Sequence, residues 1–347
     1  MTQLAQSLSH SWEPFILIIG LLMIGHSAAR EGLFEFIGGV VARTPGSDLS
    51  LFVVTMIFVA IVTALLNLDT SVVFMTPVAL HAARTRNADE TPFLYGTILM
   101  SNSASLLLLG SNLTNLLVFA SRPVRGSEFA SHMLLAWLSS VIITIGVVAA
   151  LRFRELRRRS ERAASPPSRV KVGPGLLGVV LAVVAMLALS QPALPVLAIG
   201  LVLELLEMMV TRRAGLAELM RVVSPIVVGP LFVIAVLVGW LGRSWHAIGN
   251  LVAHTNSLLT ALVAGAASLL INNLPAASLF AGQRIAHPYA LLLGLNLGPN
   301  AFVTGAMSTM LWFRLVRRDG ASPSVRRFVL IGIPVTVLTM AAAVALV

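Results

Sequence analysis

The run NLDT at residues 67–70 decides the fold, because it puts polar side chains in the middle of the apolar stretch 49–84. A second run, NNLP at 272–275, interrupts the apolar stretch 255–285 in the same way. One helical crossing of a bilayer needs about 20 residues, so each stretch is too long for a single crossing. We therefore predict that 49–84 and 255–285 are re-entrant hairpins with polar tips.

The composition around these stretches indicates a membrane protein. Hydrophobic residues make up 57% of the 347 residues, charged residues only 11%, and the mean hydropathy is +0.91, whereas soluble domains carry roughly 25% charged residues. Backbone polar groups in lipid must be paired internally, which favours helices. We expect an all-α, multi-pass protein of the cytoplasmic membrane, surrounded by lipid. Full spans are predicted at 15–29, 92–121, 130–151, 174–190, 195–211, 222–242, 287–313 and 328–347, with interfacial segments at 29–49 and 242–255.

The basic residues test this arrangement. Of the 24 Lys and Arg, 20 lie in the segments 30–49, 84–91, 152–173, 212–221 and 314–327, and the other four lie between them. The positive-inside rule puts such segments in the cytoplasm, so we expect the 152–173 linker inside and the N-terminus outside. If either hairpin crossed fully, the basic segments would fall on both sides. Because the charges sit in short loops, the net charge of +10 does not indicate a nucleic-acid partner.

The basic linker 152–173 divides the chain into two similar halves. The first, 1–151, contains a span, the hairpin 49–84, the polar-interrupted span 92–121 and the span 130–151. The second, 174–347, contains the hairpin 255–285 and the interrupted span 287–313, and has two extra spans. The hairpins enter from opposite sides, which predicts the inverted-topology repeat of secondary transporters.

Two more polar clusters interrupt apolar spans, GSNLTN at 110–115 and NLGPN at 296–300. Gly and Pro loosen a helix and free backbone groups. Half-helix N-termini suit an anion and freed carbonyls a small cation, and irregular backbone at this depth lines a cavity or is buried in protein. Four such clusters in matching positions predict a central substrate and ion site. Its candidate residues are Asn67, Asp69, Thr70, Ser111, Asn112, Thr114, Asn115, Asn272, Asn273, Asn296, Asn300 and Thr304.

Asp69 is the acidic residue that we place nearest the middle of the membrane. Intramembrane acids are costly and usually functional, so Asp69 is the candidate for binding a cation or carrying a proton. It could also simply cap the half-helix that follows. Glu204, near the end of span 195–211, and the isolated Asn102 are better explained by structure and packing. No metal site or cofactor is expected, apart from a coupling ion, H⁺ or Na⁺.

At these clusters the sequence resembles the ion transporter superfamily. The run 67–77 is similar to its first hairpin, 111–117 to the signature of its arsenite permease branch, and 272–275, 295–300 and 309–312 to the second repeat of that branch. The similarity covers nearly the whole chain from about Trp12 and extends more loosely to citrate and sodium–dicarboxylate symporters and sodium/proton antiporters. The resemblance implies a pseudosymmetric fold with scaffold and transport domains, an elevator-like movement, a small ionic substrate, and a homodimer or an ATPase subunit as partners.

Three positions depart from the arsenite permease pattern. Asn102 stands where those permeases tend to have Asp, and Asn296 and Asn300 stand where they tend to have Asp and Lys. The leading functional prediction is secondary active transport of a small inorganic ion or anion, with arsenite-type metalloid efflux coupled to a proton or cation gradient first. A sodium/proton antiporter and a dicarboxylate- or citrate-type symporter remain alternatives. No motif for an enzyme active site is found.

Overall fold

The described part of the chain is helical and contains no strand. The computed structural model describes residues 3–157, 173–211, 220, 223, 225–245 and 252–347. Most of the predicted linker and part of the predicted interfacial segment 242–255 therefore lie outside the described residues. The helices are α1 (Gln3–Arg30), α2 (Leu33–Ala42), α3 (Asp48–Leu65), α4 (Leu68–Thr85), α5 (Glu90–Ala104), η1 (Leu109–Ser111), α6 (Leu113–Phe119), α7 (Gly126–Leu151), α8 (Phe153–Leu156), α9 (Pro174–Ala188), α10 (Ala193–Thr211), α12 (Pro225–Ser244), α14 (Ser257–Ile271), α15 (Asn273–Ala281), α16 (Pro288–Leu297), η2 (Gly298–Ala301), η3 (Val303–Gly305), α17 (Met307–Arg318) and α18 (Val325–Val344).

The all-α prediction is confirmed, and helices occupy every predicted span. By length and composition, α1, α3, α7 and α18 could each cross a membrane. Both predicted interruptions are present: the span 92–121 is divided into α5, η1 and α6, and the span 287–313 into α16, η2, η3 and α17. Helix α17 continues to Arg318, five residues beyond the predicted end of the span at 313. It can do so because this last part is amphipathic: Arg314 and Arg317 are exposed while Leu315 and Val316 are buried.

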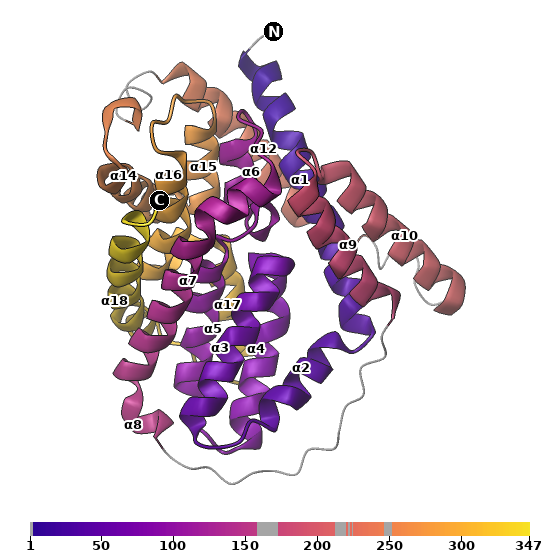
Figure 1. Cartoon of the computed structure of the whole chain (residues 1–347), viewed down its shortest axis with the longest axis vertical. Helices are drawn as coiled ribbons and strands as arrows, with labels where there is room; N and C mark the ends of the chain where they lie inside the picture. Colours follow the sequence, from indigo (N-terminus) through magenta and orange to yellow (C-terminus); the bar gives the residue numbers. More distant parts are fainter. Residues whose placement is uncertain (1–2, 158–172, 212–219, 221–222, 224, 246–251) are drawn as a thin grey trace.

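Helices α3 and α4 pack against each other and against α5, as the first hairpin prediction requires. Arg86 joins the beginning of α3 to the end of α4, and its side chain is buried together with that of Asp48. The guanidinium donates to the backbone oxygens of Thr44 (3.0 Å) and Gly46 (2.7 Å) and lies 4.0 Å from the Asp48 carboxylate. The beginning of α3 and the end of α4 therefore meet at one end of the molecule, the end that also carries α8 (Figure 1).

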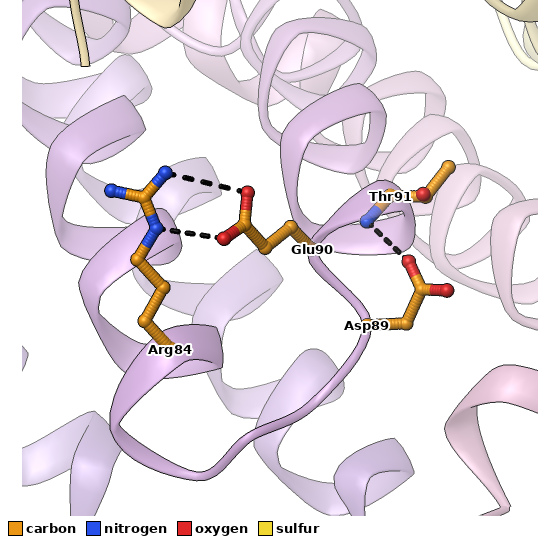
Figure 2. A network of polar contacts seen from close by, with 4 residues as sticks. All are labelled: Arg84, Asp89, Glu90 and Thr91. Carbon is orange, nitrogen blue, oxygen red and sulfur yellow. Dashed lines mark hydrogen bonds and ion pairs between the residues drawn. The ribbon is translucent and has the colours of Figure 1, made fainter. Parts of the chain in front are cut away.

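A polar turn connects α4 to α5 (Figure 2). Arg84 donates to both oxygens of Glu90, at 2.7 Å and 3.5 Å. Asp89 caps α5 by accepting the Thr91 backbone N–H at 2.8 Å, which satisfies one of the free donors of the first helical turn. The ion pair is exposed, in contrast to the buried Arg86, so it adds little stability.

The second helix pair, α14 and α15, is shorter than the first. Helix α14 packs closely on α16, and a Cβ added to Gly294 would clash with the Ala261 backbone oxygen. The backbones approach this closely because glycine has no side chain, as is common between membrane helices. The second helix pair and α16 share one hydrophobic cluster with α6, while the first helix pair and α5 belong to another.

Helices α1, α9 and α10 form a separate group at one side of the molecule (Figure 1) and pack on one another. Glu31, which follows α1, accepts backbone N–H groups of Gly175 (2.7 Å) and Leu176 (3.3 Å) at the start of α9. Arg30 pairs with Glu207 of α10 at 2.6 Å. The pairing agrees with the structural role expected for span 195–211. Helix α2 leads from this group to the outer end of α3 (Figure 1).

Candidate functional site

The tip between α3 and α4 is built on Asn67. This residue has φ 153°, which L-residues rarely adopt, and its side-chain oxygen caps α4 by accepting the Thr70 N–H at 2.7 Å. The amide nitrogen of Asn67 and the hydroxyl of Thr70 are both buried without a hydrogen-bond partner. Helix α1 lies against the tip, because a Cβ on Gly25 would be 2.9 Å from the Thr70 methyl group. The tip therefore presents two buried polar atoms that have no hydrogen-bond partner among the described residues.

Asp69 lies in the first turn of α4 and is half-buried. In the part of the chain that the structure describes, its carboxylate makes no hydrogen bond or ion pair with a protein group. The hydroxyl of Ser71, two residues after Asp69 in the same helix, lies 3.3 Å from the Ser101 hydroxyl of α5. Through this contact the Asp69 turn adjoins the polar end of α5. A carboxylate without a protein partner in this setting is chemically suited to a cation or a proton.

The first helix break lies between α5 and α6, and side chains satisfy its freed carbonyls. The Ser111 hydroxyl lies within hydrogen-bond distance of the Ser105 and Leu108 backbone oxygens, at 2.8 Å and 2.6 Å, and donates its single proton to one of them. The Asn115 amide donates to the same two oxygens, at 2.9 Å and 3.1 Å. Asn112 caps α6 with its side-chain oxygen. Each helix end leaves backbone groups without intrahelical partners. Here the side chains of Ser111, Asn112 and Asn115 take the place of those partners.

The two helix breaks meet at Asn296, in the last turn of α16. Its side-chain oxygen accepts from Asn112 Nδ2 (2.9 Å) and Thr114 Oγ1 (2.6 Å). Its amide nitrogen donates to Asn115 Oδ1 at 2.7 Å. Asn296 is 1% exposed, so these three bonds are made away from solvent. The carboxamide of Asn296 thus joins the second half of the chain to the first break.

Asn300, in η2, makes the reciprocal connection. Its side-chain oxygen accepts from Asn102 Nδ2 at 2.9 Å, and its amide donates to Ser103 Oγ (3.0 Å) and the Leu99 backbone oxygen (3.2 Å). Helix α18 leaves room for this loop, because a Cβ on Gly332 would clash with the Asn300 backbone oxygen. The end of α5 therefore bonds the break of the second half, as the end of α16 bonds that of the first. We call Asn102, Asn112, Asn115, Asn296 and Asn300 the central amides.

The tip between α14 and α15 also has an asparagine with positive φ that caps the helix after it. Asn272 has φ 75° and accepts the Leu274 N–H at 3.4 Å. Its amide donates to the Thr304 backbone oxygen at 3.0 Å, and the Thr304 hydroxyl donates to the Leu269 backbone oxygen at 3.1 Å. Thr304 is exposed and Asn272 half-buried. Asn273 is buried, but no hydrogen bond joins it or Asn272 to the central amides among the described residues.

The structure groups the predicted site residues into three sets. Asn112, Thr114, Asn115, Asn296 and Asn300 share the central network, with Ser111 at its edge. Asn67, Asp69 and Thr70 form the first tip, and Asn272, Asn273 and Thr304 lie at the second. That any of them binds an ion or substrate stays a prediction.

Sequence reasoning missed the polar end of α5. The sequence assigns Asn102 to packing, and its bond to Asn300 is a contact of that kind; what the sequence does not show is that this bond reaches a predicted site residue, or that the Asn102 side-chain oxygen has no partner among the described residues. Ser103 and Ser105 also bond central amides. The signal was present as alternating small polar residues in SNSAS, 101–105, just before the break.

The central network is electrically neutral. Its members are carboxamides, hydroxyls and backbone groups, with no Lys, Arg, Asp or Glu side chain bonded to it in the hydrogen bonds described above. Within the described residues, no group of three His, Cys, Asp or Glu side chains could hold a metal ion. The central network can therefore offer oxygen and amide groups to a small ion, and the titratable carboxylate of Asp69 lies at the first tip, outside this network.

Apolar helices, two helix breaks that bond each other, and two asparagine tips define a multi-pass membrane transporter. The chain belongs to the citrate transporter family, CitMHS, whose model matches residues 4–307. The predicted resemblance to this group of transporters is thereby confirmed.

Curated relatives agree with this assignment. The chain is 27% identical to an uncharacterized transporter of Mycobacterium tuberculosis, over 96% of the chain and 84% of that protein. It is 24% identical to the arsenical pump membrane protein of Escherichia coli K12, over 95% of the chain and 86% of that protein. A shorter match, at 25% identity to a second uncharacterized transporter of M. tuberculosis, spans 40% of the chain and about a third of that relative (32%).

A solved structure supports the fold. The crystal structure of the Alcanivorax borkumensis YdaH transporter matches 99% of the chain and 86% of its own, with a TM-score of 0.62 at 13% identity. At this identity the likeness concerns the fold alone.

Proposed function

We propose that the protein is a secondary active transporter that moves a small inorganic ion or anion across the cytoplasmic membrane, with arsenite-type metalloid efflux as the first candidate. The observation that carries this proposal is Asp69, a half-buried carboxylate at a helix tip with no protein partner among the described residues. Beside it lie the unpartnered amide of Asn67 and hydroxyl of Thr70. A group that exchanges a proton or cation at this place would couple substrate movement to an ion gradient.

The neutral central amides favour a neutral or weakly charged substrate. Arsenite is largely uncharged at neutral pH and can be held by hydroxyl and amide groups, and the chain has no cysteine to bind it as a thiolate. The arsenical pump proteins among the relatives support the same choice.

Two other substrates have specific support. The family model is named for citrate transport, and half-helix N-termini can stabilise an anion without a basic side chain. A sodium/proton antiporter would need little more than the Asp69 carboxylate. We rank both below metalloid efflux. The central amides include no basic side chain that could pair with citrate, and a sodium/proton antiporter would not need the central amides as ligands.

We also propose the topology. The two halves, 1–151 and 174–347, form an inverted repeat, in which α3–α4 and α14–α15 are re-entrant hairpins. The 152–173 linker is cytoplasmic and the N-terminus lies outside. The Arg86 contacts support the first hairpin, since they hold the outer ends of α3 and α4 together.

Flux into proteoliposomes of the purified protein tests the proposed function. Arsenite, sodium, citrate and a dicarboxylate are compared under imposed proton and sodium gradients, without ATP. Arsenite accumulation driven by a gradient supports the proposal, and citrate or sodium movement selects one of the alternatives. If no substrate accumulates without ATP, but arsenite does so when an ATPase subunit is added, the protein is not a secondary transporter by itself.

Single-cysteine labelling tests the topology, and the absence of native cysteine makes it clean. Positions 45 and 89 flank the first hairpin, are exposed, and should react from the same side as position 158. Labelling of positions 45 and 89 from opposite sides would convert the hairpin into a full crossing.

A further inference from the structure

A polar pocket of about 520 Å³ lies at the N-terminal end of α1, opposite the end that carries α8 (Figure 1). Its walls come from α1, the end of α12, and the turns that follow α6 and α15. The side chains that matter here are Gln3, Gln6, His10, Ser121 and Arg243. Among the described residues no Asp or Glu lines the pocket, and Arg243 carries the formal positive charge of this lining. This pocket is separate from the central amides and from Asp69.

Arg243 has no carboxylate partner among the described residues. Its guanidinium donates to the Gly239 backbone oxygen at 3.0 Å and lies 2.7 Å from His10 Nδ1. Arginine has donors only, so His10 Nδ1 must be the acceptor, and the neutral ring then carries its proton on Nε2. The pair therefore holds a fixed cation beside a second N–H donor. Glycine at 282 keeps this arrangement open, because a Cβ there would clash with the Arg243 side chain.

Of the other polar groups of the pocket, Gln3 keeps a donor that can face a ligand, whereas the Ser121 hydroxyl uses its single proton within the protein. The side-chain oxygen of Gln3 is occupied, since it accepts from the Ser244 hydroxyl at 2.8 Å. Its NH₂ group has no acceptor among the described residues. The Ser121 hydroxyl donates to the Ala281 backbone oxygen at 3.0 Å, which ties the turn after α6 to the end of α15. An arginine without a carboxylate partner among the described residues, with the His10 Nε2–H and the Gln3 NH₂ group beside it, matches an anion better than a cation.

We propose that this pocket binds an anionic phosphate group and that Arg243 is its main ligand, assisted by His10 Nε2. The planar guanidinium fits phosphate oxygens in a two-pronged geometry. The volume lies in the range of small-molecule sites and can admit either free phosphate or the phosphoglycerol headgroup of a lipid at the membrane surface. Because the walls come from α1, α12 and the turns after α6 and α15, a bound anion would connect α1 to the end of the second hairpin.

The test uses the purified full-length protein in neutral detergent, titrated with inorganic phosphate in one arm and phosphatidylglycerol in the other, at constant ionic strength. Calorimetry and the shift in thermal unfolding temperature report binding. Arg243→Gln should weaken binding by about ten-fold or more, the size expected for losing a charge-assisted hydrogen bond. Arg284→Gln is the matched control, because Arg284 is exposed near the same turn and does not line the pocket.

Saturable binding of either probe by the parent protein and Arg284→Gln, lost in Arg243→Gln, supports the site; the arm that responds names the source of the phosphate. Equal binding by all three proteins, equal losses in both variants, or no binding in either arm would overturn it. His10→Gln should reduce affinity less than Arg243→Gln. The result does not depend on the proposed coupling role of Asp69, since Asp69→Asn should bind the probes like the parent protein.

Discussion

The two asparagine tips both begin a helix at a residue with positive φ, but they differ in burial and chemistry. Asn67 and Asn272 both adopt positive φ and both cap the helix that follows. The first tip is buried, carries Asp69 and leaves polar atoms without partners, whereas the second is half-buried and its amide is bonded to the Thr304 backbone oxygen. The comparison teaches that an asparagine with positive φ can break a helix at both tips, while among the described residues of the two tips only the first carries an acidic side chain, Asp69.

The largest effect is expected at the central amides, on which the helix breaks of both halves depend. Asn112→Ala and Asn300→Ala should lower transport at least about ten-fold, because each removes bonds between the halves worth about 1–2 kcal/mol per contact. Ser139→Ala is the control, since that hydroxyl bonds the Ala136 backbone oxygen of its own helix. Proteoliposome flux and thermal unfolding measure the outcome. Normal transport by both variants would show that these amides only fasten helices.

The next effect compares a buried and an exposed arginine at the end of α4, below the first tip. Arg86→Met should lower the free energy of unfolding by about 3–5 kcal/mol, because it leaves the buried Asp48 carboxylate without this cation. Arg84→Met, which removes the exposed pair with Glu90 (Figure 2), should change it by less than about 1 kcal/mol. Unfolding in detergent compares the two variants. Equal stability of the two would mean that Arg86 does not fasten the first hairpin.

A smaller effect compares the tips directly. Asn67→Ala should cost about 1–3 kcal/mol, since alanine is strained at positive φ and cannot cap α4. Asn67→Gly should cost only a few tenths, roughly, because glycine accepts this φ. Asn272→Ala should cost less than Asn67→Ala, as its capping bond is longer, at 3.4 Å, and its surroundings are more exposed. If Asn67→Gly unfolds as early as Asn67→Ala, backbone strain is not the cause.

The helix breaks could be predicted because Gly, Pro and Asn interrupt apolar runs, which is a local signal. The partners of the central amides could not, because Asn102 and Asn300 are distant in sequence and meet only when α5 crosses η2. The end of α17 was placed at 313 because the apolar run stops there, although the helix continues to Arg318 with its basic side chains on an exposed face. Whether the Asp69 carboxylate has a bonding partner likewise depends on residues distant in sequence, so the sequence alone could not predict it.

The most direct test of the account is transport by Asp69→Asn, which keeps the shape of the side chain and removes its titration. Glu204→Gln is the control, because Glu204 is a buried acid on α10, in the group of helices that we assign to the scaffold. In proteoliposomes with an imposed gradient, Asp69→Asn should lose substrate accumulation and the pH dependence of flux, while downhill exchange persists and Glu204→Gln behaves like the parent protein. Uphill transport by Asp69→Asn with unchanged pH dependence, together with its loss in Glu204→Gln, would contradict the account and move ion coupling to α10.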